Sequence, residues 1–159
     1  MSNVPPATIA AIDLGSNSFH MIVAHTVGDH FRVVDRIRHM VRLGAGLGPD
    51  HQLSAAAMTR ALECLAQFGE RVRGLPADAV RVVGTNTLRK ARNTANFLAQ
   101  AEHLLGHRID VISGHEEARL IYLGVSHGLD DDADVRLVVD IGGGSSEFIL
   151  GRRFDPLYM

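Results

Sequence analysis

Residues 9–18 read IAAIDLGSNS: an apolar run, an aspartate (Asp13) and then a short turn rich in Gly and Ser. Residues 137–145, LVVDIGGGS, repeat this order around Asp140. Another apolar run follows each turn, so each stretch predicts a β-hairpin whose first strand ends near an aspartate. Two matching hairpins near opposite ends of the chain predict two similar units with a cleft between them, lined by both turns.

The residue types in these turns suit a phosphate and a cation together. Glycine lets the backbone approach a ligand closely, and successive backbone N–H groups in a turn form an anion-binding nest. The aspartate can hold a hydrated divalent cation, because Mg²⁺ takes one or two carboxylates together with water and phosphate oxygens. One such turn alone is also an ordinary hairpin turn. The repetition favours a phosphate held from two sides.

Between the hairpins, strand and helix patterns alternate. We expect strands at 8–13, 19–26, 31–43, 80–84 and 109–112, and helices at 55–73, 94–105 and 115–127. Ser54 and Asn93 are the expected N-caps of the first two helices, and Gly106 should end the second. This order predicts an α/β fold with a mixed sheet.

An acidic stretch at 130–134 is the expected linker between two domains. The first domain should occupy residues 1–128, and residues 129–159 should be the start of a second, similar domain. Because the chain ends inside an apolar stretch that predicts a strand, we expect it to be an N-terminal fragment of a longer protein.

Composition indicates a globular protein. Of 159 residues 46% are hydrophobic, and the formal net charge is −2, which gives no basic field for nucleic acid. No apolar run approaches the roughly 20 residues of a membrane span. The single cysteine, Cys64, excludes an intramolecular disulfide and fits a reducing compartment. We therefore expect a cytoplasmic protein without a nucleic-acid partner.

Thr85 and Arg89 follow an expected strand, at a position where ligands gather in α/β sheets. Arg89 could make a bidentate contact with phosphate. Alternatively, Thr85 caps a helical turn and Arg89 is an ordinary surface residue.

Two glutamates are candidates for a carboxylate that orients or deprotonates water. Glu117 lies in the first turn of a helix, where Ser113 and Glu116 already account for a capping box. Acidic residues also favour helix N-termini for electrostatic reasons, so a structural role is open for Glu117. Glu147 follows the second turn and is either a second carboxylate of the site or a solvent-facing strand residue.

Other patterns carry less weight. The histidines form no set with zinc-ligand spacing, and no Gly-rich loop contains the single lysine, which excludes a P-loop. Arg36, Arg38 and Arg42 share one face of the third expected strand. That face is either simply solvated or a basic rim for a polyanion.

Four segments of the chain resemble the exopolyphosphatase and guanosine pentaphosphate phosphohydrolase family, which is part of the actin, Hsp70 and sugar-kinase superfamily. They are AIDLGSNSFHM at 11–21, GTNTLRKA at 84–91, ISGHEEARLIYLG at 112–124 and VDIGGGSSE at 139–147. The resemblance implies a ribonuclease-H-like, actin-like fold in two domains. It also implies Mg²⁺-dependent release of terminal phosphate from polyphosphate or of the γ-phosphate from guanosine pentaphosphate.

The resemblance also implies roles for individual residues. Glu117 would be the catalytic base, with Asp140 and Glu147 as further catalytic carboxylates, and the metal would be held by Asp13, Asp140 and Glu147. The phosphate contacts that it implies are Ser16, Asn17, Ser18, Arg89, Gly143, Gly144 and Ser145, and the position of Thr85 after a strand adds that residue to them. Ser146 stands where the family usually has Thr, which keeps the hydroxyl. Most of the second domain would be missing, so we expect this fragment alone to be weakly active or inactive, and the full-length protein to be a homodimer.

Two rival functions are a non-catalytic nucleotide-binding module of the actin and Hsp70 type and an alarmone sensor. Neither needs Glu117 and Glu147 as extra carboxylates beside a phosphate. The hydrolase is therefore the favoured hypothesis, without a choice between its two substrates.

Overall fold

The computed structural model of this chain describes residues 7–28, 30–130 and 133–159. The first unit contains β1 (Thr8–Leu14), β2 (Phe19–Val27), β3 (His30–His39), α1 (Ala55–Val72), β4 (Val80–Gly84), α2 (Asn86–Lys90), α3 (Thr94–Leu105) and β5 (Asp110–Val111). The rest of the chain forms α4 (Gly114–His127), β6 (Val135–Ile141), β7 (Ser146–Arg152) and β8 (Asp155–Tyr158). Short 3₁₀ turns lie at Gly44–Gly46 and Ala77–Ala79.

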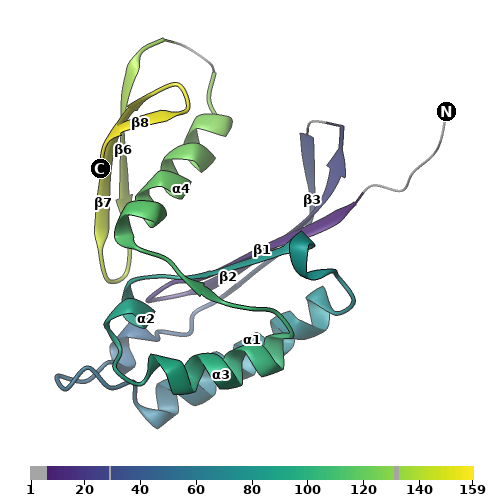
Figure 1. Cartoon of the computed structure of the whole chain (residues 1–159), viewed down its shortest axis with the longest axis vertical. Helices are drawn as coiled ribbons and strands as arrows, with labels where there is room; N and C mark the ends of the chain where they lie inside the picture. The colour runs from purple at the N-terminus through teal and green to yellow at the C-terminus, as the bar shows by residue number, and fades with distance from the viewer. Residues whose placement is uncertain (1–6, 29, 131–132) are drawn as a thin grey trace.

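The strands form two separate sheets. The first has the order β3-β2-β1-β4-β5, in which β1 pairs antiparallel with β2 and parallel with β4. The second is the antiparallel sheet β6-β7-β8. In Figure 1 the second sheet and α4 rise from one end of the first sheet, while α1 and α3 lie beneath it. The expected α/β fold with a mixed sheet is therefore confirmed.

The main core lies between the first sheet and the helices α1 and α3. Ile12, Phe19 and Phe68 are almost completely buried there. The two helices cross closely at Gly69, where an added Cβ would lie 2.5 Å from the carbonyl oxygen of Leu104. A side chain at this position would push α3 away from α1, so glycine is required by the close approach of the two backbones.

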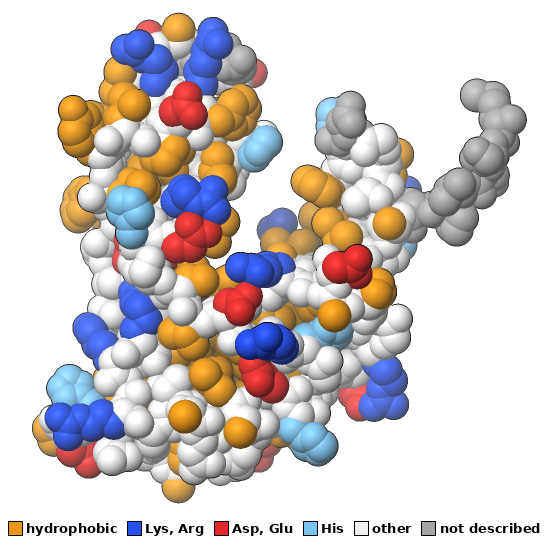
Figure 2. Space-filling model, viewed as in Figure 1, with side chains coloured by type: hydrophobic (Ala, Val, Ile, Leu, Met, Phe, Trp, Pro, Cys, Tyr) orange, Lys and Arg blue, Asp and Glu red, His pale blue; other side chains and the backbone are white. Residues whose placement is uncertain are grey.

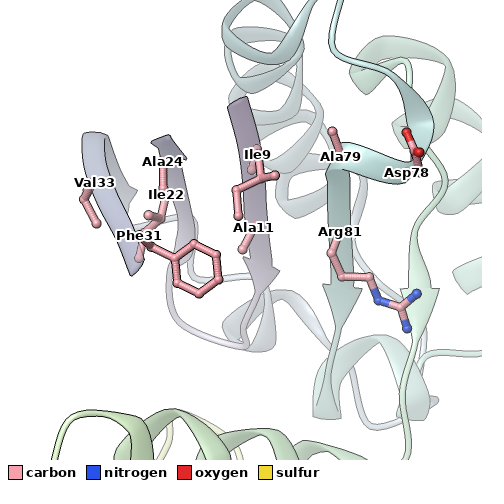
Figure 3. A pocket seen from close by; sticks show the side chains of 10 residues that line it. Ile9, Ala11, Ile22, Ala24, Phe31, Val33, Asp78, Ala79 and Arg81 are labelled. Carbon is pink, nitrogen blue, oxygen red and sulfur yellow. The ribbon is translucent and has the colours of Figure 1, made fainter. Parts of the chain in front are cut away.

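Among the residues that the structure describes, no helix packs along the opposite face of the first sheet (Figure 1). Ile9, Ala11 and Ile22 line a hollow there of about 470 Å³, with Phe31 and Arg81 at its sides. Figure 3 shows these side chains projecting from neighbouring strands. Figure 2 shows the notch that separates this face from the second unit. The uncovered face is thus one wall of an open cleft.

Helix α4 packs on the second sheet through Ala118 and Tyr122, which bury Ile149 of β7. The other face of that sheet exposes Leu137, Ile141 and Phe148. The domain boundary after residue 128 is therefore kept as a proposal, because α4 precedes it in sequence yet packs on the sheet that follows it. Asp131 and Asp132 of the expected acidic linker lie outside the described residues.

Two local expectations are wrong. The third strand was expected to reach residue 43, but β3 ends at His39 because Arg42 has a positive φ of 53° and its N–H donates to Asn17 O at 2.8 Å. Asn93 precedes α3 without capping it; its side-chain amide instead bonds the backbone N–H and carbonyl of Leu53 at 2.9 and 3.0 Å. The other caps form as expected: Ser54 Oγ accepts from Ala57 N–H, and Gly106 ends α3 in a left-handed conformation.

Candidate active site

The first hairpin turn is enclosed by other parts of the chain. Gly15 makes the turn possible, because a Cβ there would lie 2.9 Å from Ser18 O. Ser16 and Ser18 are buried. Arg42 N–H bonds Asn17 O, and Gly44 N–H bonds Ser16 O, both at 2.8 Å. Asp13, at the end of β1, is positioned by this turn.

Helix α2 supports the same turn from the other side. Thr87 Oγ1 donates to Ser16 Oγ at 2.7 Å, and both residues are buried. Thr85, also buried, links β4 to α2, and its N–H lies 3.4 Å from Leu14 O. The parallel pairing of β1 with β4 therefore brings the residues after β4 beside the first turn.

The second hairpin turn lies directly against the first. Gly142 N–H bonds Ser145 O at 3.0 Å, and Asn86 Nδ2 donates to Gly144 O at 2.7 Å. A Cβ at Gly143 would lie 2.7 Å from Cβ of Asn17, so glycine is needed for this contact. The two turns quoted at the start thus meet at the junction of the two sheets.

Three carboxylates converge in a pocket of about 270 Å³ beside the two turns. Asp13, Glu117 and Asp140 line it together with Thr85, and the remaining walls are Val83, Ile112, Leu120 and Ile121. The pKa of Asp13 is raised to about 6, first because the surrounding protein buries its carboxyl group and second because of the charges of Glu117 and Asp140. Asp13 is nevertheless exposed by its surface area, so its carboxylate is accessible to a ligand.

Glu117 is held by Arg89. Arg89 Nη1 donates to Glu117 Oε2 at 2.8 Å and to the carbonyl of Ile112 at 2.9 Å. The two side chains are only 24% and 14% exposed, so this is a partly buried ion pair. The expected contact of Arg89 with phosphate stays a prediction; in this structure its guanidinium orients Glu117. No spacing in the sequence indicated this pairing, because the two residues are brought together by β4, β5 and the start of α4.

The neighbouring Glu116 has a different environment. Its carboxylate pairs with Arg119 at 2.7 and 2.8 Å and does not line the pocket. Of the two consecutive glutamates, Glu117 therefore faces the site.

Glu147 lies outside this pocket. It stands opposite Asp140 in the β6–β7 register but lines an adjacent hollow with Gly114, His115 and Met159. Its Oε2 is buried without a hydrogen-bond partner among the described residues. Glu147 is thus a direct cross-strand neighbour of Asp140 but does not line the pocket that Asp140 shares with Asp13, and its expected role at the metal stays a prediction.

The pocket has enough carboxylates for a hydrated divalent cation such as Mg²⁺, but not for a metal ion held by protein side chains alone. Within residues 7–28, 30–130 and 133–159, no group of three or more His, Cys, Asp or Glu side chains could hold a metal ion. Mg²⁺ does not need such a group, since it usually keeps several waters and takes one or two carboxylates. Asp13 and Asp140 supply that number, and none of the described residues that line their pocket is a lysine or arginine. Among the described residues, no helix is long and apolar enough to cross a membrane.

The chain is similar to known proteins of one family. Residues 22–159 match the sequence model described as the Ppx/GppA phosphatase family. The chain is 52% identical over 142 residues to a guanosine-5'-triphosphate,3'-diphosphate pyrophosphatase of Aeromonas hydrophila. These 142 residues are 89% of this chain and 28% of that relative. The chain thus spans little more than a quarter of the length of this curated relative.

Solved structures show the same fold. An exopolyphosphatase from Cytophaga hutchinsonii superposes with a TM-score of 0.88 at 30% identity, over 95% of this chain and 48% of that one. The PPX-GPPA enzyme of Aquifex aeolicus gives a TM-score of 0.83 at 26% identity, over 96% of this chain and 50% of that one. The actin-like α/β fold expected from the sequence is confirmed by these neighbours.

Proposed function

This chain belongs to the Ppx/GppA phosphatase family, and from that premise we propose that its protein hydrolyses terminal phosphoanhydride bonds of polyphosphate or of guanosine pentaphosphate. The observation that supports this most directly is the convergence of Asp13, Glu117 and Asp140 in one pocket beside two Gly/Ser turns. A partly buried carboxylate, oriented by an arginine and placed near anion-binding turns, is what an attacking water requires.

In this proposal the turns bind the terminal phosphate. The backbone N–H groups around Ser16–Ser18 and Gly143–Ser145 donate to its oxygens, and Thr85 adds a hydroxyl at the pocket wall. The turns are already fixed against each other by the bond from Asn86 to Gly144, so little ordering is needed when the phosphate binds.

Glu117 is proposed to position the water and to accept its proton. The water oxygen forms the new bond to phosphorus, the bridging P–O bond breaks, and the released phosphate chain or nucleotide leaves with that electron pair. Arg89 holds one carboxylate oxygen of Glu117 and so fixes its direction. Catalysis of this kind is mainly positioning and electrostatic stabilisation.

We propose Mg²⁺ as the cofactor, held by Asp13 and Asp140. It would supply positive charge to the phosphate oxygens. A cation there would also offset the burial and the neighbouring negative charges that raise the pKa of Asp13. Glu147, expected from the resemblance to share this site, would have to turn toward Asp140 to do so. A cytoplasmic location and a homodimeric full-length protein also belong to the proposal.

The test compares adjacent glutamates in the full-length protein. Phosphate release from long-chain polyphosphate and from guanosine pentaphosphate would be measured with Mg²⁺ for the wild type, Glu117→Gln and Glu116→Gln. Loss of a positioned base should cost about 10²–10⁴-fold in turnover for Glu117→Gln. Glu116→Gln should stay close to wild type, because Glu116 pairs with Arg119 outside the pocket. Normal turnover in Glu117→Gln would refute its role, and no release by the wild type would favour a binding module.

A further inference from the structure

Two arginines lie on the same face of the first sheet as Asp13. In the strand register Asp13 stands opposite His20, which stands opposite Arg38; in the next row Ala11, Ile22 and Arg36 are aligned in the same way. Directly paired residues project from the same face of a sheet. Arg36 and Arg38 therefore project from the face that α1 and α3 leave uncovered, on the β3 side of the carboxylate pocket.

Neither arginine is neutralised by a carboxylate. Among the described residues Arg36 and Arg38 are exposed and form no ion pair, whereas Arg71 pairs with Asp35, Arg81 with Asp110 and Arg89 with Glu117. The acidic residue of β3, Asp35, stands opposite the buried Val23 and so belongs to the other face. The charge that β3 presents to the cleft is therefore only positive.

The row that contains Arg38 extends toward the first turn. The pKa of His20 is lowered, first by burial and second by the charge of Arg38, which places Arg38 close enough to act on the adjacent strand. His20 Nε2 lies 2.8 Å from Ser18 Oγ, so this row reaches from the edge strand to the turn itself. The row thus joins the positive charge of Arg38 to the turn through His20, whose lowered pKa favours the neutral imidazole.

The two charged regions are close enough for one ligand. Asp13 and Arg38 lie on strands that are two spacings of about 4.8 Å apart, so their backbones are about 10 Å from each other. The long side chain of Arg38 can span part of this distance. A single phosphate in the pocket would leave the arginines without a partner. A ligand with further phosphates attached to the first would place its additional negative charge on them.

We propose that Arg36 and Arg38 form an anionic subsite for the phosphates that are not hydrolysed. The ligand class is a chain of linked phosphates, inorganic or carried by a nucleotide, whose terminal group occupies the pocket. This deepens the proposed function and rests on it, because it takes the pocket as the site of the terminal phosphate. Arg36 and Arg38 bind substrate in this scheme and take no part in the proton transfer.

The test uses calorimetric titration of the full-length protein with tripolyphosphate and with orthophosphate, without a divalent cation. Removing one charge-assisted hydrogen bond should weaken tripolyphosphate binding about tenfold, so Arg36→Ala/Arg38→Ala should bind it roughly 100-fold more weakly. Orthophosphate binding should not change. The matched control is Arg32→Ala on the same strand, because Arg32 stands opposite His25 and Thr8 and so projects from the other face.

A parallel kinetic measurement separates this proposal from the hydrolase assignment. With active protein, the double variant should raise KM for substrate about 100-fold with kcat nearly kept, because the two arginines bind only phosphates that do not react. Equal binding of tripolyphosphate by the wild type and the double variant, or an equal loss of affinity in Arg32→Ala, would overturn the subsite, whatever Glu117→Gln shows. Arginine-dependent tripolyphosphate binding in a protein that releases no phosphate would support the subsite and refute the hydrolase.

Repeating the titration with guanosine 5'-triphosphate 3'-diphosphate identifies the source of the phosphates. Weaker binding of both ligands by the double variant assigns the subsite to phosphate chains in general. Weaker binding of tripolyphosphate alone assigns it to inorganic polyphosphate.

Discussion

The two Asp–Gly–Ser turns have similar sequences and different surroundings. Residues 41–44 and α2 enclose the first turn, and Ser16 and Ser18 are buried. The second turn is bound to the first unit by a hydrogen bond from Asn86, and Gly142–Gly144 are exposed. The local pattern therefore specifies the hairpin in both places, whereas burial of the turn is decided by segments distant in sequence.

The same contrast holds for the sheets behind the turns. Phe19, which starts β2 after the first turn, is completely buried, whereas Phe148 in β7 is 61% exposed. The first hairpin is covered on one face by α1 and α3, and the second is covered on one face by α4 alone. The first turn thus belongs to the main core of the chain, and the second lies beside a much smaller one.

The largest expected effect comes from truncating the two phenylalanines. Phe19→Ala should lower the free energy of unfolding by about 3–5 kcal/mol, because it leaves a cavity in the main core. Phe148→Ala should change it by less than about 0.5 kcal/mol, since the ring is mostly exposed. Urea unfolding followed by circular dichroism measures both. A comparable loss of stability in Phe148→Ala would show that its face of the second sheet is covered in solution.

The next effect concerns the hydroxyl that supports the first turn. Thr87→Val should cost about 1–2 kcal/mol, because Ser16 Oγ loses its buried donor. The matched change in the second turn, Ser145→Ala, should cost less than about 0.5 kcal/mol, since its hydroxyl has no hydrogen-bond partner among the described residues. Thermal unfolding of both variants checks this difference. If the two variants are equally destabilised, the turns do not differ in support as the structure indicates.

A smaller change should uncouple the two turns. Asn86→Ala removes the bond to Gly144 O and should cost about 1 kcal/mol. Hydrogen exchange should then accelerate in residues 140–146 and stay constant in residues 14–18. Equal acceleration in both segments would mean that Asn86 supports the first turn as strongly as the second.

The smallest effect tests whether Asp13 and Asp140 share one pocket. Asp140→Asn should lower the pKa of Asp13 from about 6 toward its ordinary value of 3.8, because one of the charges that raise it is removed. Carbon-13 NMR titration of the Asp13 carboxyl measures this, with Asp50→Asn in the exposed loop as control. An unchanged pKa would show that the two turns do not meet in solution.

The same raised pKa gives a pH dependence of stability. The folded state keeps the Asp13 proton up to about pH 6 and the unfolded state loses it near 3.8, so the folded state binds more protons between these values. This contribution to stability is fully present below pH 3.8 and is lost as the pH rises through 6. The decrease should be absent in Asp13→Asn.

Features set by neighbouring residues could be predicted from the sequence. The hairpins, the Ser54 cap and the end of α3 at Gly106 depend on residues a few positions apart, and all form. The strand predicted at β3 was too long, because the alternation of apolar residues continues past the point where the strand ends. A backbone hydrogen bond to Asn17 holds Arg42 out of the extended conformation. That bond joins residues 25 positions apart and leaves no local signal.

The candidate site shows the same limit. Motif positions were enough to select Asp13, Glu117 and Asp140, which share a pocket. They could not show that Arg89 pairs with Glu117, or that Glu147 faces an adjacent hollow, because both depend on how α4 leaves β5 and packs on the second sheet.

The central position of β1 has a consequence for the order of assembly during synthesis. Its partner on one side, β2, follows after a short turn, whereas its partner on the other side, β4, begins 66 residues after the end of β1. Contacts between distant segments form later than local ones, since a longer loop must close. The β1–β2 hairpin can therefore pair as it leaves the ribosome, while Asp13 meets Thr85 and Glu117 only after β4 has docked. The nascent chain can thus pair its first hairpin before its binding site is complete.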